Sequence, residues 1–361
     1  MSKNSRSVLQ KFRLFQDLQL SIFRKFMLIF LSFLLIFILI YGLICAFLYF
    51  AQENLIFHPQ KLASDFNFTK LFPNSIEINL KTLDNINLNG LFFATKSTDL
   101  NENSILQNSQ SKLYPNYLPN LLNNSTEISQ NLPQKSQIQN QTDLSNTTNS
   151  KGLVFYLHGN SGSIAGWGNI AKFYNKLGFD VLMPDYRGFG KSEGKIISQE
   201  QLFADNQLFY NFAKSIYPEN KITVMGFSIG TGMAAKITQN NRPKQLILQA
   251  PYYSLYGVMT DNFLFVPDFL LKYKLETAKY LENSTIPITI FHGGLDETIH
   301  YSNSLKIQKK LNQNKNTNLT KQNEEKEKIP IKIKLITLPN QTHMGIENNE
   351  TYKKQIKQIL E

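Results

Sequence analysis

The feature that most constrains this chain is an uninterrupted apolar run over residues 27–50. It reads MLIFLSFLLIFILIYGLICAFLYF, carries no charge, and has Ser32 as its only strongly polar side chain. As a helix it would rise roughly 36 Å, enough to cross the hydrocarbon core of a bilayer with some tilt. A buried helix that does not span a bilayer is disfavoured, because nothing amphipathic interrupts the run. The sequence therefore predicts one transmembrane helix.

A cleaved signal peptide is the main alternative for this run. Its apolar region would normally cover about 7–15 residues and would end at a small-x-small site. No clean site of that kind follows here, and bulky Ile44 before Cys45 argues against a lipoprotein signal. Tyr49 lies where an interfacial aromatic residue is expected. We predict a signal anchor at residues 27–50, and the single cysteine excludes a disulfide framework.

The net charge of +11 is concentrated in two segments. Residues 1–26 hold six basic residues and one acid, and residues 306–334 hold nine lysines and three glutamates. The rest of the chain sums to zero, which argues against a nucleic-acid partner. Under the positive-inside rule, residues 1–26 form a cytoplasmic tail of a single-pass membrane protein. The main domain, residues 51–361, is then expected on the non-cytoplasmic side, whether periplasmic, extracytoplasmic or lumenal.

Composition divides the main domain. Residues 75–80 and 86–94 read as a hairpin around an Asp84–Asn85 turn. Residues 95–150 follow, and 33 of these 56 are Asn, Ser, Gln or Thr. A segment of this composition cannot bury enough apolar surface to offset its ordering entropy, so we predict a disordered insertion. A lysine-rich loop is expected at about residues 312–329.

From residue 151 onward, short apolar runs alternate with helical segments. The runs, typical of strands covered on both faces, lie at residues 152–157, 180–183, 222–225, 245–249, 288–291 and 331–338. The helical segments lie at residues 164–177, 198–216, 230–240, 302–311 and 345–360. This alternation predicts an α/β fold with a mostly parallel sheet and helices on both faces.

One pentapeptide in this pattern carries chemistry. Residues 226–230 read Gly-Phe-Ser-Ile-Gly, directly after a predicted strand and before a predicted helix. This is the setting of a nucleophile elbow, in which a serine occupies a strained turn and neighbouring side chains would collide with strand and helix. Without partner residues the motif would indicate only a glycine-rich turn. The sequence predicts Ser228 as a nucleophile.

A serine needs a general base, and the base needs an acid that orients it. His343 lies in a loop after the last predicted strand, and Asp296 follows the strand before it. The chain order Ser228, Asp296, His343 is the order of this hydrolase architecture, and each residue follows the carboxyl end of a strand. His300, four residues after Asp296, is the one competing base.

Four other polar residues are expected to stabilise the structure rather than to take part in catalysis. His158 is expected to shape a turn, and His292 at a strand end is expected to be structural. Asp185 and Arg187 are expected to hold a turn by charge pairing. Backbone N–H groups of Ile229, after the nucleophile, and of Asn160, in the turn after the first parallel strand, would bind an oxyanion.

Several motifs together resemble the α/β-hydrolase superfamily. They are FYLHGNSG, PDYRGFGKSEG, GFSIG, APYYSL, FHGGLDE and the terminal histidine. They look most like its membrane-anchored branch, which is related to the bud-emergence proteins and to serine-aminopeptidase-like and lysophospholipase-like hydrolases. NLIFHP after the anchor resembles the juxtamembrane segment of that branch. The resemblance covers about residues 50–94 and 151–361.

The resemblance implies an α/β-hydrolase fold with Ser228, Asp296 and His343 as a triad and with Asn160 and Ile229 as oxyanion donors. It also implies a short cap at about residues 251–285, whose apolar side chains either pack within the cap or form an acyl site. In this chain Thr342 precedes His343, where many relatives carry glycine.

The sequence therefore predicts a membrane-anchored serine hydrolase. It would cleave an acyl ester or thioester of a small or lipid-like substrate through an acyl-enzyme, with no cofactor and no metal. A serine peptidase or transacylase with the same triad, or a non-catalytic membrane scaffold, are the alternatives. The sequence does not identify protein partners, which stay unknown.

Overall fold

The computed structural model describes residues 3–95, 150–262, 267–320 and 332–361. Within it the chain divides into two compact units, Met1–Gln52 and Glu53–Glu361, and each is described by itself. The insertion predicted at residues 95–150 lies outside the described residues except at its two ends. Residues 321–329 of the predicted loop at residues 312–329 and residues 263–266 of the cap also lie outside the described residues.

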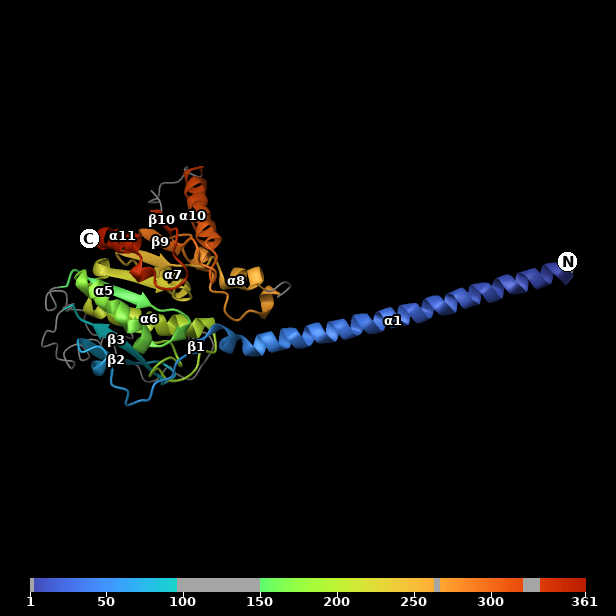
Figure 1. The fold of residues 1–361 in the computed structure, drawn as a ribbon, viewed down its shortest axis with the longest axis horizontal. Coiled ribbons are helices and arrows are strands. Elements are labelled where there is room, and N and C mark those ends of the chain that lie inside the picture. The colour runs from blue at the N-terminus through green and yellow to red at the C-terminus, as the bar shows by residue number, and fades with distance from the viewer. Residues whose placement is uncertain (1–2, 96–149, 263–266, 321–331) are drawn as a thin grey trace, which may run out of the picture. The chain divides into compact units, whose positions relative to one another are not determined.

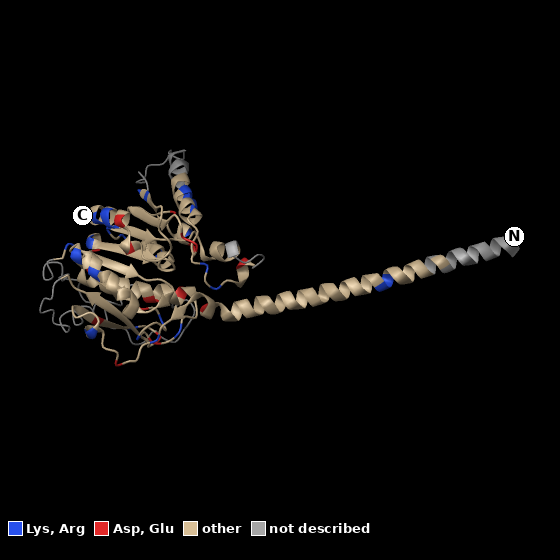
Figure 2. Cartoon of the chain, in the orientation of Figure 1, with Lys and Arg blue, Asp and Glu red and all other residues tan. Residues whose placement is uncertain are grey.

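One long apolar helix, α1 (Lys3–Ile56), accounts for the first unit. Of the described residues, its Leu18–Ile56 part is long and apolar enough to cross a membrane, with a mean hydropathy of 3.0 in the most apolar window. Large apolar side chains are exposed on all sides of it, and Figure 2 shows no charged colour along most of its described length. The helix is longer than the predicted 27–50 because no proline or glycine pair stops it at either end.

The second unit is built on an eight-stranded sheet of order β10-β9-β8-β7-β4-β6-β3-β2 (Figure 1). Its six C-terminal strands pair in parallel, as predicted. The strands are β2 (Ser75–Lys81), β3 (Asn87–Phe93), β4 (Leu153–Leu157), β6 (Asp180–Pro184), β7 (Ile222–Phe227), β8 (Gln245–Gln249), β9 (Ile288–Gly293) and β10 (Ile333–Leu338). The predicted hairpin is the antiparallel pair β2–β3, and Asn85 in its turn has a φ of 67°.

Helices cover both faces of this sheet. They are α4 (Ile164–Trp167), α5 (Ala171–Lys176), α6 (Gln199–Ile216), α7 (Gly230–Asn240), α8 (Leu255–Asn262), α9 (Thr277–Tyr280), α10 (Ser302–Thr320) and α11 (Glu350–Leu360). Short 3-10 turns occur at Phe68–Lys70, Gly168–Ile170, Glu219–Lys221, Asp268–Leu270 and Ile346–Asn348.

Side chains of β4 show why both faces need cover. Leu153, Phe155 and Leu157 join one apolar cluster with residues of α6, α7 and α10. Val154 and Tyr156, which alternate with them, join a second cluster with residues of α5 and α11. Because successive side chains of a strand point to opposite faces, the two clusters are the two sides of one sheet. Burial of each large apolar side chain stabilises the fold by about 1.5–3 kcal/mol relative to leaving that side chain in water.

Two helix predictions need correction. The single helix predicted at residues 164–177 is α4, a 3-10 turn and α5, because Gly166 and Gly168 weaken the middle of the segment. Residues 312–320 of the predicted loop are helical, because α10 continues through Thr320 and no proline or glycine interrupts it.

A two-stranded element was not predicted at all. β1 (His58–Pro59) pairs in parallel with β5 (Ser161–Gly162). It joins the residues that follow α1 to the loop that follows β4.

Candidate active site

Ser228 lies in the sharp turn between β7 and α7. Its φ is +53°, a left-handed backbone conformation that residues other than glycine rarely adopt. Its backbone N–H donates to the backbone oxygen of Gln249 at 2.9 Å. The side-chain hydroxyl of Thr231 donates to the Ser228 carbonyl oxygen at 2.6 Å. The turn is therefore held from both sides, as a nucleophile elbow requires.

The two glycines of the motif are required by close backbone contacts. A Cβ on Gly226 would lie 2.5 Å from the Gly230 oxygen, and a Cβ on Gly230 would lie 2.2 Å from the Leu157 oxygen. Both distances are far below van der Waals contact. The pentapeptide therefore brings the start of α7 directly against the ends of β7 and β4.

The structure brings Ser228, His343 and Asp296 into one chain of hydrogen bonds. The Ser228 Oγ lies 3.0 Å from His343 Nε2, and His343 Nδ1 lies 2.8 Å from Asp296 Oδ2. A carboxylate can only accept, so Nδ1 carries the hydrogen and Nε2 presents its lone pair to the serine hydroxyl. Ser228 and Asp296 are buried, and the His343 side chain is 13% exposed.

Asp296 is held by several donors. Backbone N–H groups of Thr298 and Ile299 donate to its Oδ1 at 3.0 and 2.8 Å. Burial by itself would raise the pKa of this carboxyl, but hydrogen bonds from His292, His343 and Ile299 hold the pKa well below its usual range. Asp296 is therefore a carboxylate throughout the neutral range.

His292 has a place in this arrangement that sequence reasoning undervalued. It is fully buried, its Nδ1 accepts from the Ser304 hydroxyl at 2.6 Å, and its Nε2 donates to the Ile299 oxygen at 2.7 Å. The same Nε2 lies 3.4 Å from Asp296 Oδ2. His292 thus fixes the turn that presents Asp296. Its spacing of four residues from Asp296 was the available signal.

His300 is not brought to Asp296 or Ser228. Its Nδ1 is 2.8 Å from the Ser302 hydroxyl, and the side chain is exposed. The geometry therefore favours His343 over His300 as the base.

The loop that carries His343 packs tightly on the loop that carries Asp296. A Cβ on Gly293 would lie 2.2 Å from the Gln341 oxygen, so only glycine allows the approach. Thr342, in place of the glycine of many relatives, is not among the described non-glycine residues with positive φ, which are Asn85, Ser228, Ala250 and Leu275. Threonine is accommodated there without backbone strain.

Two backbone N–H groups face no protein acceptor near Ser228. Within the described ranges, the amides of Ile229 and Asn160 donate to neither backbone nor side-chain oxygen. Ile229 is the first residue after Ser228, and Asn160 follows β4, the neighbour of β7 in the sheet. Catalytic sites that bind an oxyanion use backbone donors of this kind, so these two amides are the candidate oxyanion donors.

Comparisons with known proteins bear on the fold and on part of the sequence. The family model described as serine aminopeptidase, S33, matches residues 148–272, which include the elbow. The solved structure of the Pyrococcus furiosus esterase Pf2001 superposes with a TM-score of 0.55 at 16% identity, over 84% of this chain and 96% of that one. At this identity the superposition establishes the fold. The chain therefore has the α/β-hydrolase fold.

Two curated relatives are informative. The uncharacterized protein R595 of Acanthamoeba polyphaga mimivirus is 29% identical over 181 residues, which cover 44% of this chain and 61% of the relative. Lysophosphatidylserine lipase ABHD12 of Danio rerio is 31% identical over 110 residues, which cover 28% of each chain. The matches span less than two thirds of these relatives. One of these two relatives thus carries the name of a lipase, at low identity and over a small part of each chain.

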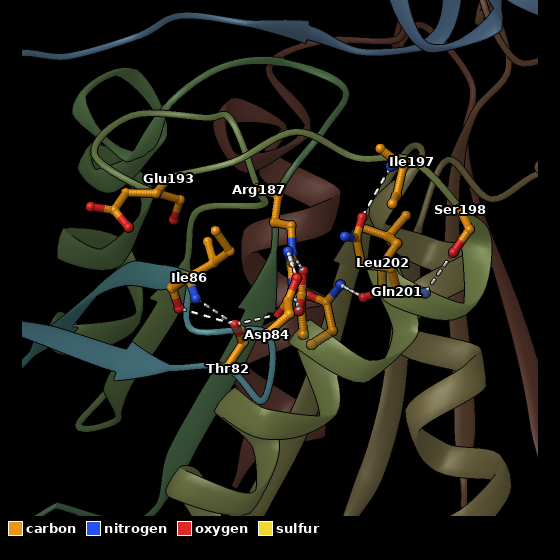
Figure 3. Close-up of polar contacts among 12 residues, drawn as sticks. Thr82, Asp84, Ile86, Arg187, Glu193, Ile197, Ser198, Gln201 and Leu202 are labelled. Carbon is orange, nitrogen blue, oxygen red and sulfur yellow. Dashed lines mark hydrogen bonds and ion pairs between the residues drawn. The ribbon is translucent and has the colours of Figure 1, made fainter. Parts of the chain in front are cut away.

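The turn after β6 is held by charge pairing, as predicted. Arg187 donates to both oxygens of Asp84 in the hairpin turn, at 2.5 and 2.7 Å, and to Asp205 of α6 at 2.6 and 3.1 Å. Figure 3 shows Arg187 directed at Asp84, with Thr82 donating to the same carboxylate. The guanidinium therefore connects the β2–β3 hairpin and helix α6 to one loop.

Beneath the Asn160 loop, His158 and Asp185 form a second buried pair. His158 Nδ1 donates to the Gly159 oxygen at 2.7 Å, and its Nε2 lies 3.2 Å from Asp185 Oδ1. Asp185 also accepts from the Ile164 N–H at 3.0 Å, and burial raises the pKa of its carboxyl. His158 therefore shapes the turn, as predicted. Over the described ranges no cluster of three or more His, Cys, Asp or Glu residues could hold a metal ion.

Proposed function

We propose that this α/β-hydrolase is a membrane-anchored serine hydrolase that cleaves acyl esters through an acyl-enzyme. The observation that carries the proposal is the continuous hydrogen-bond chain from Ser228 Oγ through His343 to Asp296, beside two unpartnered amides. An isolated serine is a poor nucleophile, and this arrangement is the one that activates it.

The first half-reaction forms the acyl-enzyme. His343 Nε2 takes the hydroxyl proton as Ser228 Oγ bonds to the substrate carbonyl carbon, and the carbonyl oxygen becomes an oxyanion. The amides of Ile229 and Asn160 donate to that oxygen, and ionised Asp296 stabilises the imidazolium. The tetrahedral intermediate then collapses, the C–O bond to the alcohol breaks, and His343 returns the proton to the leaving oxygen.

The second half-reaction releases the acid. Water loses a proton to His343 Nε2 and attacks the acyl carbon, and the second tetrahedral intermediate expels Ser228 Oγ, which regains the proton. Thioesters would follow the same route.

A lipid-like acyl substrate is favoured by two observations. A relative carries the name lysophosphatidylserine lipase, and the cap between β8 and β9 presents Phe269 with 80% of its surface exposed. The long apolar helix α1 would hold the domain at a membrane, where such substrates are concentrated.

A serine peptidase is the competing proposal, because the matching family model is named for an aminopeptidase. The same triad would attack an amide. Aminoacyl p-nitroanilides therefore belong beside esters in the assay.

The test is hydrolysis of p-nitrophenyl esters of graded chain length by the full chain in detergent micelles. We expect turnover that rises with chain length and falls at least about 10³-fold in both Ser228→Ala and His343→Ala. His300→Ala is the matched control and should stay within about twofold of wild type. Equal, mild losses in the two histidine variants would overturn the base assignment, and an inactive wild type would overturn the proposal.

A further inference from the structure

The last turn of the apolar helix α1 and the residues that follow it contact the loop that contains Asn160. We call residues 53–62 the strap. The Asn160 side-chain Nδ2 donates to the Ile56 oxygen at 3.0 Å, and the His58 backbone N–H donates to the Asn160 oxygen at 2.8 Å. The Gln60 N–H donates to the Gly162 oxygen at 2.8 Å, which completes the β1–β5 pairing.

Ile56 is also the last residue of α1. The last four carbonyl groups of a helix have no partner within the helix and need an outside donor. Asn160, 104 positions away in the sequence, supplies one. The carboxyl end of the apolar helix is thus hydrogen-bonded to the side chain of Asn160, and the backbone N–H of the same residue is a proposed oxyanion donor.

The strap holds the cap as well. Glu53 accepts from Lys272 Nζ at 3.1 Å and from the Tyr273 hydroxyl at 3.0 Å. Phe57 is buried, and its ring meets the Tyr273 ring edge to face at 5.2 Å. One short segment therefore contacts both the Asn160 loop and the cap.

We propose that the strap is a positioning element of the oxyanion site. The inference rests on the proposed function, and it adds that the strap must hold Asn160 in place for catalysis. The Asn160 side chain and carbonyl are both engaged by the strap, so the direction of its N–H depends on the strap. A donor displaced by about 1 Å from a developing oxyanion can cost about 10²-fold in rate. Catalysis by this hydrolase therefore depends on the residues that join it to α1.

His58→Pro tests the backbone bond in the full chain, because proline has no N–H to donate to the Asn160 oxygen. His58→Ala is the matched control, since it keeps the N–H and removes only an exposed side chain. With a short-chain p-nitrophenyl ester we expect kcat to fall at least about tenfold in His58→Pro, with KM within about threefold of the control. Equal kcat values in two folded variants would overturn the proposal.

Asn160→Asp tests the side-chain bond without a proline. Aspartate has the same shape but no N–H donor, and Ser161→Ala alters a neighbouring exposed side chain as its control. We expect Asn160→Asp to lower kcat at least about tenfold and to weaken binding of a phenylboronic acid, a tetrahedral oxyanion mimic, by a similar factor.

The boronic acid separates positioning from stability. A strap that only stabilised the fold would lower the unfolding temperature and leave boronate affinity and kcat of the folded enzyme unchanged, which would overturn the proposal. An active wild type with unaffected strap variants would overturn this inference alone. An inactive wild type would overturn the proposed function together with it.

Discussion

The backbone of Ser228 is strained, and its proposed role as the nucleophile in a sharp turn explains that strain. A serine at a φ of +53° is strained by about 1 kcal/mol or more relative to glycine, and the surrounding hydrogen bonds hold it there. We expect Ser228→Gly to raise the free energy of unfolding by about 1 kcal/mol relative to Ser228→Ala, and both to abolish ester hydrolysis. Thermal and urea unfolding of the two variants measure the difference. A glycine variant less stable than the alanine variant would contradict the strain argument.

His292 should matter for rate although it does not touch the proposed nucleophile. Its Nε2–H bonds Ile299 and lies 3.4 Å from Asp296, so its loss frees the turn that presents the carboxylate. We predict that His292→Leu lowers kcat about tenfold or more while KM changes little. The control His300→Ala should leave kcat within about twofold. Steady-state kinetics on the folded variants measure kcat and KM. An unchanged kcat in His292→Leu would refute the positioning role of His292.

Between elements, the ion pair of Arg187 with Asp84 joins the β2–β3 hairpin to the loop after β6. The hydrogen bonds from Arg187 lower the pKa of Asp84 to about 2, against an ordinary value near 3.8. A depressed carboxyl pKa stabilises the fold fully above the unfolded value, and the contribution disappears as pH falls through the folded value.

We therefore expect Asp84→Asn to cost about 1 kcal/mol at pH 7, a small value because the Asp84 side chain is 55% exposed and solvent screens the pair. The difference from wild type should shrink between pH 4 and pH 2. Urea unfolding at several pH values measures it. A difference that stayed constant down to pH 2 would show that the ion pair is not its source.

The elements show what a sequence alone can predict. The strand at residues 245–249 and the helix at residues 230–240 match their predicted bounds, because a short strand buried on both faces and a helix that begins at a glycine turn leave clear local patterns. The break within residues 164–177 was missed, because the surrounding apolar period continues across Gly166 and Gly168. Local pattern also does not show how far α10 extends.

The candidate site also contains a part that the sequence predicts and a part that it does not. The Ser228, Asp296 and His343 side chains that lie together are recognisable from a motif and from strand ends, and their roles remain predictions. The contact of Asn160 with Ile56 joins residues 104 positions apart through a side-chain amide and a backbone carbonyl. No local pattern encodes such a contact, and β1 and β5, two residues each, are too short to show a period.

For the whole molecule, the charge distribution predicts an orientation. Residues 1–26 carry a net charge of +5 before the apolar run. We expect an N-terminal tag to be cytoplasmic and a C-terminal tag to lie across the membrane, as measured with a membrane-impermeant label on intact and permeabilised cells. Arg24→Glu with Lys25→Glu should yield a mixed population. An N-terminal tag labelled in intact cells would contradict the predicted orientation.

The central claim is that Ser228 is an activated nucleophile in a chain with the α/β-hydrolase fold. The most direct measurement is labelling of the full chain with a fluorophosphonate, followed by mass spectrometry of the labelled peptide. The account predicts one adduct on Ser228, absent from Ser228→Ala and strongly slowed in His343→Ala. Folded wild-type protein that remains unlabelled, or that is labelled at another residue, would contradict it.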